Sequence, residues 1–146
     1  MMYSGFGEYL KKLNEIEGKS KEIAKTAVYD GADIVTDQIR TNIDTINNIH
    51  GYQKQDLKDT LGIAPMVIVI GGGINTKVGW DGYGSVPTEK YPKGLPNQLL
   101  ARSIESGTSF RSKTPFVRRA VNKTKKPAIQ AMQDRIDEEM KKIMEE

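Results

Sequence analysis

The sequence predicts a single α+β domain, residues 1–146, with a long N-terminal helix, a small antiparallel β-sheet containing a hairpin, and a C-terminal helix packed on the sheet. Three observations predict this fold. Apolar residues recur in steps of mostly three and four over residues 20–48. Two apolar runs flank a glycine triplet between residues 64 and 80. Helical spacing then returns from Thr114 to the end of the chain.

The first helix is predicted over residues 20–48, where one stripe would be buried. Its members are Ile23, Ala27, Val28, Ala32, Val35, Ile39, Ile43 and Ile46. Gly31 interrupts the pattern, and it indicates either a bend or a close packing contact. A shorter helix over residues 8–16 is expected to end at Gly18, which would act as its C-cap. Residues 1–19 therefore form a separate N-terminal segment, which is either mobile or a contact for a partner.

The hairpin is predicted from residues 66–70 and 74–80, because the second run alternates apolar and polar residues as a half-buried strand does. Gly71, Gly72 and Gly73 permit a tight reversal between the runs. Pro65 cannot donate to a sheet ladder, so a break or an edge position is expected there. The triplet lacks the lysine-serine or lysine-threonine ending of a nucleotide-binding loop, which disfavours the alternative that it cradles phosphate.

Residues 81–97 are predicted to form an irregular loop, because three prolines and several glycines interrupt them. Long loops in compact domains are usually functional or disordered. Tyr83 and Tyr91 are candidate interface anchors that would order against a partner. The alternative is a mobile insertion.

Order is expected to return at residues 99–104 as a short helix or strand. Thr114 is predicted to cap the last helix, with Pro115 in its first position and Phe116 filling the gap between helix and sheet. Pro127 is expected to kink this helix near Lys123. The predicted buried stripe comprises Val117, Val121, Ala128, Met132, Ile136, Met140 and Ile143.

The composition argues against several classes of function. There is no cysteine and one histidine, so disulfides, thiolate metal sites and imidazole clusters are excluded. His50 near Asp56 and Asp59 is a weak candidate for a catalytic base. Asp30, Asp33 and Asp37 share one helical face and could bind a cation, although such carboxylates more often face water. We therefore expect no enzymatic activity, cofactor or metal, and the short apolar run at residues 64–70 predicts neither export nor a membrane span.

Charge is unevenly distributed although the net charge is only +3. Residues 111–126 contain seven basic residues and no acidic one, and acidic residues follow from Asp134. This polarity favours head-to-tail contacts between copies or attraction of a polyanion. The alternative is a solvated helix surface. Because Arg118 and Arg119 lie about 100° apart on a helix, at least one of them must face solvent or a partner.

Four short motifs occur in order along the chain: LKDTLGI, KVGW, ESGTS and TPFVRRAV. With them the chain resembles the small head–tail joining proteins of long-tailed bacteriophages, the neck or tail-completion family. That family has an acidic residue, an aromatic, glycine and threonine before a Pro-Phe-hydrophobic-Arg-Pro-Ala helix start. The matching residues here are Glu105, Gly107, Thr108, Pro115, Phe116, Arg118 and Ala120. The chain departs from the pattern at Ser106 and Arg119, and it lacks the Pro-x-Asp-Thr-Gly that usually precedes the first strand.

The resemblance implies a non-enzymatic structural subunit of a phage or prophage head–tail junction. Its partners would be other neck or tail proteins and further copies of itself in a ring formed on assembly. It would act in the host cytoplasm during assembly and then in the virion. The expected interface residues are Tyr83, Tyr91, Glu105, Thr108, Arg111, Arg118 and Arg119. The alternative is a small basic nucleic-acid-binding protein whose residues 111–126 contact phosphates of DNA.

Overall fold

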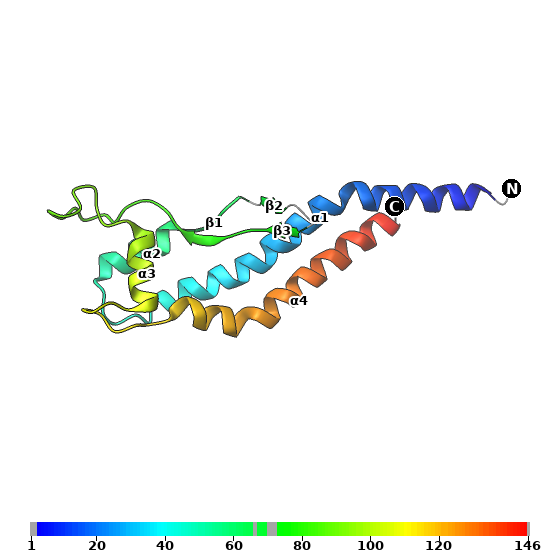
Figure 1. Ribbon diagram of the computed structural model, residues 1–146. Coiled ribbons are helices and arrows are strands. Elements are labelled where there is room, and N and C mark those ends of the chain that lie inside the picture. Colours follow the sequence, from blue (N-terminus) through cyan, green and yellow to red (C-terminus); the bar gives the residue numbers. More distant parts are fainter. Residues whose placement is uncertain (1–2, 66, 70–72, 146) are drawn as a thin grey trace.

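The computed structural model describes residues 3–65, 67–69 and 73–145. The elements are the helices α1 (Tyr3–Ile43), α2 (Gly51–Thr60), α3 (Asn97–Ser106) and α4 (Phe116–Glu145), and the strands β1 (Leu61–Ile63), β2 (Val67–Val69), β3 (Gly73–Asn75) and β4 (Val78–Trp80). Helices α1 and α4 run side by side along an elongated molecule, and the strands follow α1 on its other side (Figure 1). The predicted α+β class is confirmed.

Helix α1 is one continuous helix of 41 residues. The prediction of two helices separated at Gly18 is therefore wrong. An added Cβ at Gly18 would have nothing within 4 Å, so this glycine lies in an open stretch of helix. Its cost of about 1 kcal/mol relative to alanine is too small to end a long helix. The helix ends at Ile43, five residues earlier than predicted, although Ile46 beyond it is still buried.

Helices α1 and α4 approach closely at Gly31. A Cβ at this position would lie 2.9 Å from Cγ of Met132 and 3.3 Å from the carbonyl oxygen of Ala128. The small side chains of Ala27 and Ala32, close to Gly31 on α1, are also buried. Of the two roles predicted for Gly31, close packing is the one that the structure supports.

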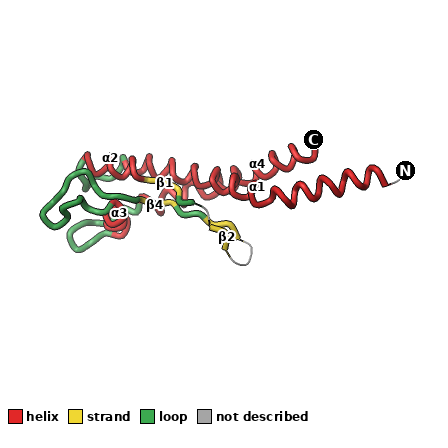
Figure 2. The backbone as a smooth tube through the Cα atoms, turned by 90° about the horizontal axis from the view of Figure 1, so that it is seen from above, coloured by secondary structure: helices red, strands yellow, loops and turns green. Residues whose placement is uncertain are grey.

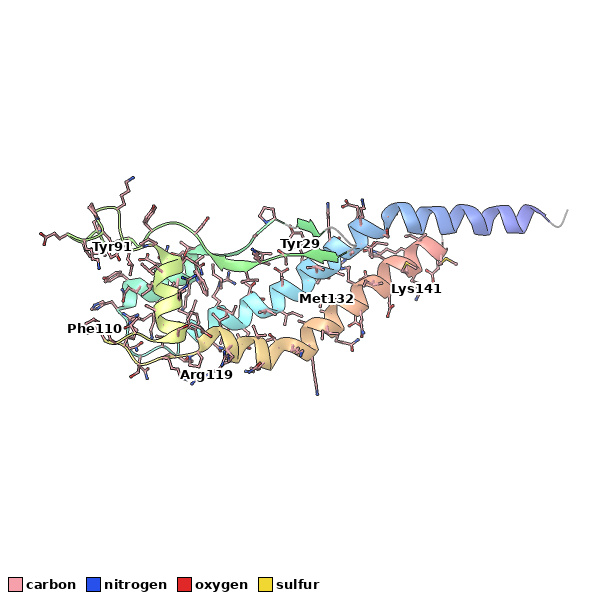
Figure 3. All side chains as sticks on the ribbon, in the orientation of Figure 1. Tyr29, Tyr91, Phe110, Arg119, Met132 and Lys141 are labelled. Carbon is pink, nitrogen blue, oxygen red and sulfur yellow. The ribbon has the colours of Figure 1, made fainter. Side chains whose placement is uncertain are left out.

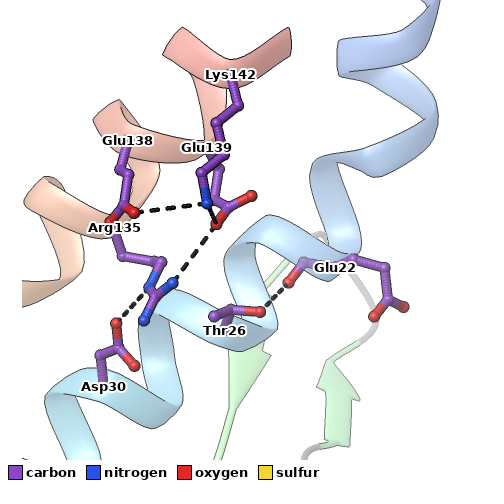
Figure 4. Close-up of polar contacts among 7 residues, drawn as sticks. All are labelled: Glu22, Thr26, Asp30, Arg135, Glu138, Glu139 and Lys142. Carbon is purple, nitrogen blue, oxygen red and sulfur yellow. Dashed lines mark hydrogen bonds and ion pairs between the residues drawn. The ribbon is translucent and has the colours of Figure 1, made fainter.

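An ion-pair network ties the two helices further along. Arg135 Nε donates to Asp30 Oδ2 at 2.6 Å, and Arg135 Nη1 lies 3.5 Å from Glu139 Oε1 (Figure 4). Lys142 extends the network by contacts with Glu138 and Glu139. The hydrogen bond and charge of Asp30 raise the pKa of Arg135 above its ordinary value. This network sets the relative level of the two helices along their common length.

The strands form one hairpin in two ladders. Strand β2 pairs antiparallel with β3, and β1 pairs antiparallel with β4 through Leu61 opposite Trp80. The ladders separate at Ala64 and Pro65 on one arm and at Thr76 and Lys77 on the other. The predicted hairpin and the break at Pro65 are thus confirmed. Gly73 belongs to β3, whereas the predicted turn residues Gly71 and Gly72 lie outside the described residues.

Helix α2 was not expected from the sequence. It contains a single buried residue, Leu57, and so has no apolar stripe that reveals its period. Its start is fixed locally, because the backbone N–H of His50 donates to Gln53 Oε1 at 2.9 Å. Helix α2 leads directly into β1 and places Leu57 in the core.

The core lies where both long helices meet α2, α3 and the β1–β4 ladder. Its buried members are Ile39, Ile43, Ile46, Leu57, Leu61, Leu100, Ala101, Ile104, Phe116 and Ala120. Phe116 is 1% exposed and its ring centroid lies 5.7 Å from that of Trp80 on β4. Trp80 Nε1 donates to the Leu57 carbonyl at 2.9 Å. Phe116 therefore fills the gap between helix and sheet as predicted, and α4 meets the sheet at this first turn and packs along α1 for most of its length.

Helix α4 differs from its prediction in two details. It starts at Phe116, one residue later than expected, and the Pro115 carbonyl accepts a hydrogen bond from the Arg119 N–H at 3.0 Å. Pro127 lies inside the helix, which changes direction in its orange part (Figure 1). Such a bend is the expected effect of an internal proline.

The buried stripe of α4 is also different from the predicted one. Val121 and Ile136 are 42% and 40% exposed, whereas Ala120 and Thr124, which lay outside the predicted stripe, are buried. Ala128 and Ile143 are buried as predicted. At the close approach of α1 near Gly31, the buried residue of α4 is the small Ala128, whereas the larger Ile143 is buried near the end of the helix.

Candidate functional site

Two loops gather at the end of the molecule opposite both termini (Figures 1 and 2). One loop covers residues 81–96 between β4 and α3, and the other covers residues 107–115 between α3 and α4. We call this region the loop end. Most of the predicted interface residues lie on these two loops, and Arg118 and Arg119 lie on the first turn of α4 beside them. The structure therefore brings the predicted residues to one end of the molecule.

The loop 81–96 contains no helix or strand, as predicted, but hydrogen bonds fix its base. The Gly84 N–H donates to the Leu95 carbonyl at 2.7 Å, and the Asn97 N–H donates to the Gly82 carbonyl at 3.1 Å. Asp56 on α2 accepts from both the N–H and the hydroxyl of Ser85 at 2.9 and 3.0 Å. These contacts hold the two ends of the loop together and attach them to α2.

A glycine is required at one point of this loop. Gly94 has φ 98°, a left-handed conformation, and a Cβ there would overlap the carbonyl oxygen of Gly84. The two backbone segments at the base of the loop, at Gly84 and Gly94, thus approach too closely for a side chain at Gly94.

The two tyrosines of the loop have different environments. Tyr83 is 57% exposed and is available to a partner. Tyr91 is half-buried, and its ring lines a cavity of about 120 Å³ with Tyr52, Leu95 and Leu100. Tyr83 therefore fits the predicted role of an interface anchor better than Tyr91, which packs on the body of the protein.

The loop 107–115 presents one residue that sequence reasoning did not select. Phe110 is 98% exposed at the tip of the loop (Figure 3). Its backbone is held in a tight turn, in which the Thr108 N–H donates to the Arg111 carbonyl at 2.8 Å and the Phe110 N–H donates to Thr108 Oγ1 at 3.2 Å. The turn therefore holds the backbone that carries this exposed aromatic residue in one hydrogen-bonded conformation.

Gly107 and Glu105 fix the position of this turn. Gly107 has φ 77°, and a Cβ there would lie 2.9 Å from the Lys113 nitrogen. Glu105, at the end of α3, accepts hydrogen bonds from the Val117 and Arg118 N–H groups at 2.8 and 2.9 Å. The amides of the first turn of α4 are therefore capped by Glu105, and not by Thr114 as predicted. Glu105 and Thr108, both expected at the interface, have internal roles that shape the loop.

The arginines predicted to face outward are exposed. Both Arg118 and Arg119 are exposed on the first turn of α4, and Arg119 is visible there in Figure 3. Arg111 is half-buried, and its Nη1 has no hydrogen-bond partner among the described residues. Within the described part of the chain, none of the seven basic residues of 111–126 forms an ion pair. The basic residues of 111–126 thus form a run of positive charge without ion-pair partners in the part of the chain that the structure describes.

The other features considered from the sequence do not form a catalytic arrangement. His50 is exposed and stacks on Tyr52 with ring centroids 5.4 Å apart. Asp30 is engaged by Arg135 and Asp37 by Arg40. Among residues 3–65, 67–69 and 73–145, no three acidic or histidine side chains come together as metal ligands would.

A groove of the surface lies along β1 and β4. It has a volume of about 680 Å³, and Gly62 and Gly79 line it together with Asp59, Asp81 and Lys77.

Comparisons with known proteins add no relative: no family model, no curated protein and no solved structure matches this chain. None of the helices described here is both long and apolar enough to cross a membrane.

Proposed function

We propose that this chain is a non-enzymatic structural subunit of a phage or prophage head–tail junction, which assists tail completion or head–tail joining through its loop end. The observation that carries the proposal is the exposed Phe110 on a fixed turn next to exposed, unpaired arginines. Aromatic residues and arginine are enriched at protein interfaces. The order of the sequence motifs and their resemblance to neck proteins give the biological setting.

The geometry of the loop end suits binding, because its contact residues are already held in place. Hydrogen bonds made by Thr108 fix the turn that carries Phe110, and the Glu105 carboxylate fixes the first turn of α4 by accepting from its N–H groups. A preformed surface loses less conformational entropy when a partner binds. Other neck or tail proteins are the proposed partners, together with further copies of the chain in a ring formed on assembly. The protein would then pass from the host cytoplasm into the virion.

A double charge reversal, Arg118→Glu with Arg119→Glu, tests the proposal in the phage or prophage that carries the gene. Both side chains are exposed, and acidic residues on the first turn of a helix interact favourably with its dipole, so the variant should fold. We expect separate heads and tails in electron micrographs and a loss of infectious particles. The matched control is Lys19→Glu with Lys21→Glu, two exposed positions on α1 far from the loop end. Normal yields of infectious particles from the arginine variant would contradict the proposal.

The second candidate function is nucleic-acid binding, which the unneutralised basic residues of 111–126 favour. Neutralisation of phosphates by these residues would make affinity fall steeply with salt, with a slope of roughly one logarithmic unit per phosphate contacted. Mobility-shift assays with duplex and single-stranded DNA at low and high salt test it. Absence of a shift at low salt would remove this candidate, whereas a salt-sensitive shift that Arg118→Glu with Arg119→Glu abolishes would favour it.

A further inference from the structure

Phe110 is a large apolar side chain that lies almost wholly in solvent. It is 98% exposed on a turn that the hydrogen bonds of Thr108 hold in place. The neighbouring Ser109 and Lys113 are also exposed, so the turn stands clear of the body of the protein (Figure 3). An aromatic side chain buries about 150–250 Å² when it is covered. Burial of this ring requires a concave apolar surface on another molecule.

The loop end also carries a pocket whose size matches a phenyl ring. This pocket, which we call the Tyr91 pocket, has a volume of about 120 Å³. A cavity of about 150 Å³ lined by apolar side chains binds benzene in another protein. Tyr52 and Val86 are 41% and 43% exposed, so the Tyr91 pocket is open to solvent on their side. Its aromatic and aliphatic lining residues are Tyr52, Val86, Tyr91, Leu95 and Leu100.

The Tyr91 pocket and Phe110 lie at different ends of α3. Leu95 and Leu100 place the pocket beside the start of α3, whereas the turn that carries Phe110 follows Ser106, the last residue of this helix. The 10 residues of α3 span about 15 Å, and Tyr91 and Phe110 lie at the upper and lower edges of the loop end in Figure 3. Phe110 therefore does not occupy the pocket of its own chain. Each copy of the chain offers the two halves of one contact at two separate places.

The charges beside these two places have opposite signs. Asp56 lines the Tyr91 pocket, and its Oδ2 accepts hydrogen bonds from the N–H and the hydroxyl of Ser85. Arg111 and Lys113 follow Phe110 on the turn, and residues 107–115 contain no acidic residue. Complementary charges across an interface orient the partners and favour the matching surface over others.

We propose that Phe110 of one copy of this chain inserts into the Tyr91 pocket of a neighbouring copy. The contact is head-to-tail, because each copy offers its turn to one neighbour and its pocket to another. Contacts of this kind close into a ring when the rotation between copies permits it. The proposal deepens the proposed function and rests on it for the assembly that brings copies together, since it names the contact between neighbours in the ring.

The contact is small. One aromatic ring buries far less than the roughly 1,200 Å² at which stable interfaces begin. We therefore expect the purified chain to associate weakly through this contact, and the junction to hold the copies together where they assemble. A weak contact of this kind is detected by a covalent trap.

Disulfide trapping tests the contact, because the chain contains no cysteine of its own. Ser109→Cys places a thiol beside Phe110, and Val86→Cys places one at the exposed edge of the pocket. When the two full-length variants are mixed at high protein concentration under mild oxidation, we expect several times more disulfide-linked dimer than either variant gives alone. No increase in the mixture would overturn the proposal.

A chain that carries both cysteines tests the head-to-tail arrangement. We expect a ladder of disulfide-linked multimers on a non-reducing gel, because every copy can be linked to two neighbours. Linkage that stops at dimers would show a reciprocal pair of copies and would overturn the arrangement.

Phe110→Ala tests whether the ring itself makes the contact. Added to Ser109→Cys, it should lower the dimer yield of the mixture to that of the separate variants. The matched control is Ile129→Ala, which removes a 43% exposed apolar side chain from α4 and should leave the yield unchanged. Circular dichroism checks that both variants keep their helix content. An unchanged yield with Phe110→Ala would overturn the proposal.

These results are separable from the test of the proposed function. Trapping uses the purified chain, whereas the charge reversal at Arg118 and Arg119 measures head–tail joining. Trapping that fails while the charge reversal blocks joining removes this contact and leaves the proposed function. Trapping that succeeds while the charge-reversed phage stays infectious supports the contact and counts against the proposed function.

Discussion

Removal of the Glu105 carboxylate should loosen the start of α4 and, with it, the loop end. This carboxylate is the cap of α4, because its two oxygens accept from the Val117 and Arg118 N–H groups at 2.8 and 2.9 Å. It also links the end of α3 to α4 across the loop that carries Phe110. In Glu105→Ala both amides lose their acceptor.

The expected loss follows from two contributions. Loss of a helix cap costs about 1 kcal/mol, within a range of about 0.5–2. The loss of a negative charge at a helix N-terminus costs a further ~0.3–1 kcal/mol. The free energy of unfolding should therefore fall by about 2 kcal/mol. Glu105→Gln keeps one amide oxygen as an acceptor and loses the charge, so it should lose about half as much.

Urea unfolding, followed by far-ultraviolet circular dichroism and by the fluorescence of the single Trp80, measures the effect. With a denaturant dependence of about 1–3 kcal/mol per molar, the midpoint should fall by roughly 1 M for Glu105→Ala. Glu89→Ala, at an exposed site of the loop 81–96, is the control. If Glu105→Ala and Glu89→Ala agree within about 0.5 kcal/mol, the cap does not hold α4 and the reasoning fails.

Three further substitutions test the packing. Gly31→Val should lower the free energy of unfolding by about 2–3 kcal/mol, because its side chain would meet Met132 and the Ala128 carbonyl; wild-type stability in urea would show that the helices are further apart. Trp80→Phe should cost about 1–2 kcal/mol by leaving the buried Leu57 carbonyl without its 2.9 Å donor, and an unchanged thermal midpoint would contradict this. Asn42→Ala removes the 3.0 Å hydrogen bond from Nδ2 to the Phe116 carbonyl and should lower the free energy of unfolding in urea by about 1 kcal/mol. An unchanged free energy of unfolding would show that this hydrogen bond does not stabilise the fold.

The long helices and the hairpin could be predicted because their buried faces repeat with the period of the backbone. The α1 residues Ile23, Ala27, Ile39 and Ile43 are buried as the spacing predicted. Helix α2 could not be predicted in this way, since Leu57 is its only buried residue. The stripe of α4 was predicted only in part. Ala128 and Ile143 are buried as expected, but the spacing of the larger apolar residues selected Val121 and passed over Ala120, which is buried in its place.

The sequence predicted the exposed arginines of the candidate site, but it did not predict the roles of Phe110 and Glu105. Helix geometry alone required an outward arginine at 118 or 119, and both are exposed. The exposure of Phe110 depends on the turn from Thr108 to Arg111, and an isolated aromatic in a sequence is more often a core residue. The role of Glu105 depends on where α3 ends relative to α4. Neither of these relations is encoded in a local pattern.

The residues that stabilise the fold differ from the residues that the loop end exposes to solvent. Phe116 and Leu57 belong to the hydrophobic core. The shapes of the loops depend instead on hydrogen bonds accepted by Asp56 and Glu105. They also depend on the positive φ angles of Gly94 and Gly107. Side chains at the exposed tips, such as Phe110 and Tyr83, contribute little to folding because they bury little area. The tips can therefore change to fit a different partner without cost to the fold. Asp56, Glu105, Gly94 and Gly107 cannot change freely, since their substitution would alter the backbone conformation of the loops that carry the exposed residues.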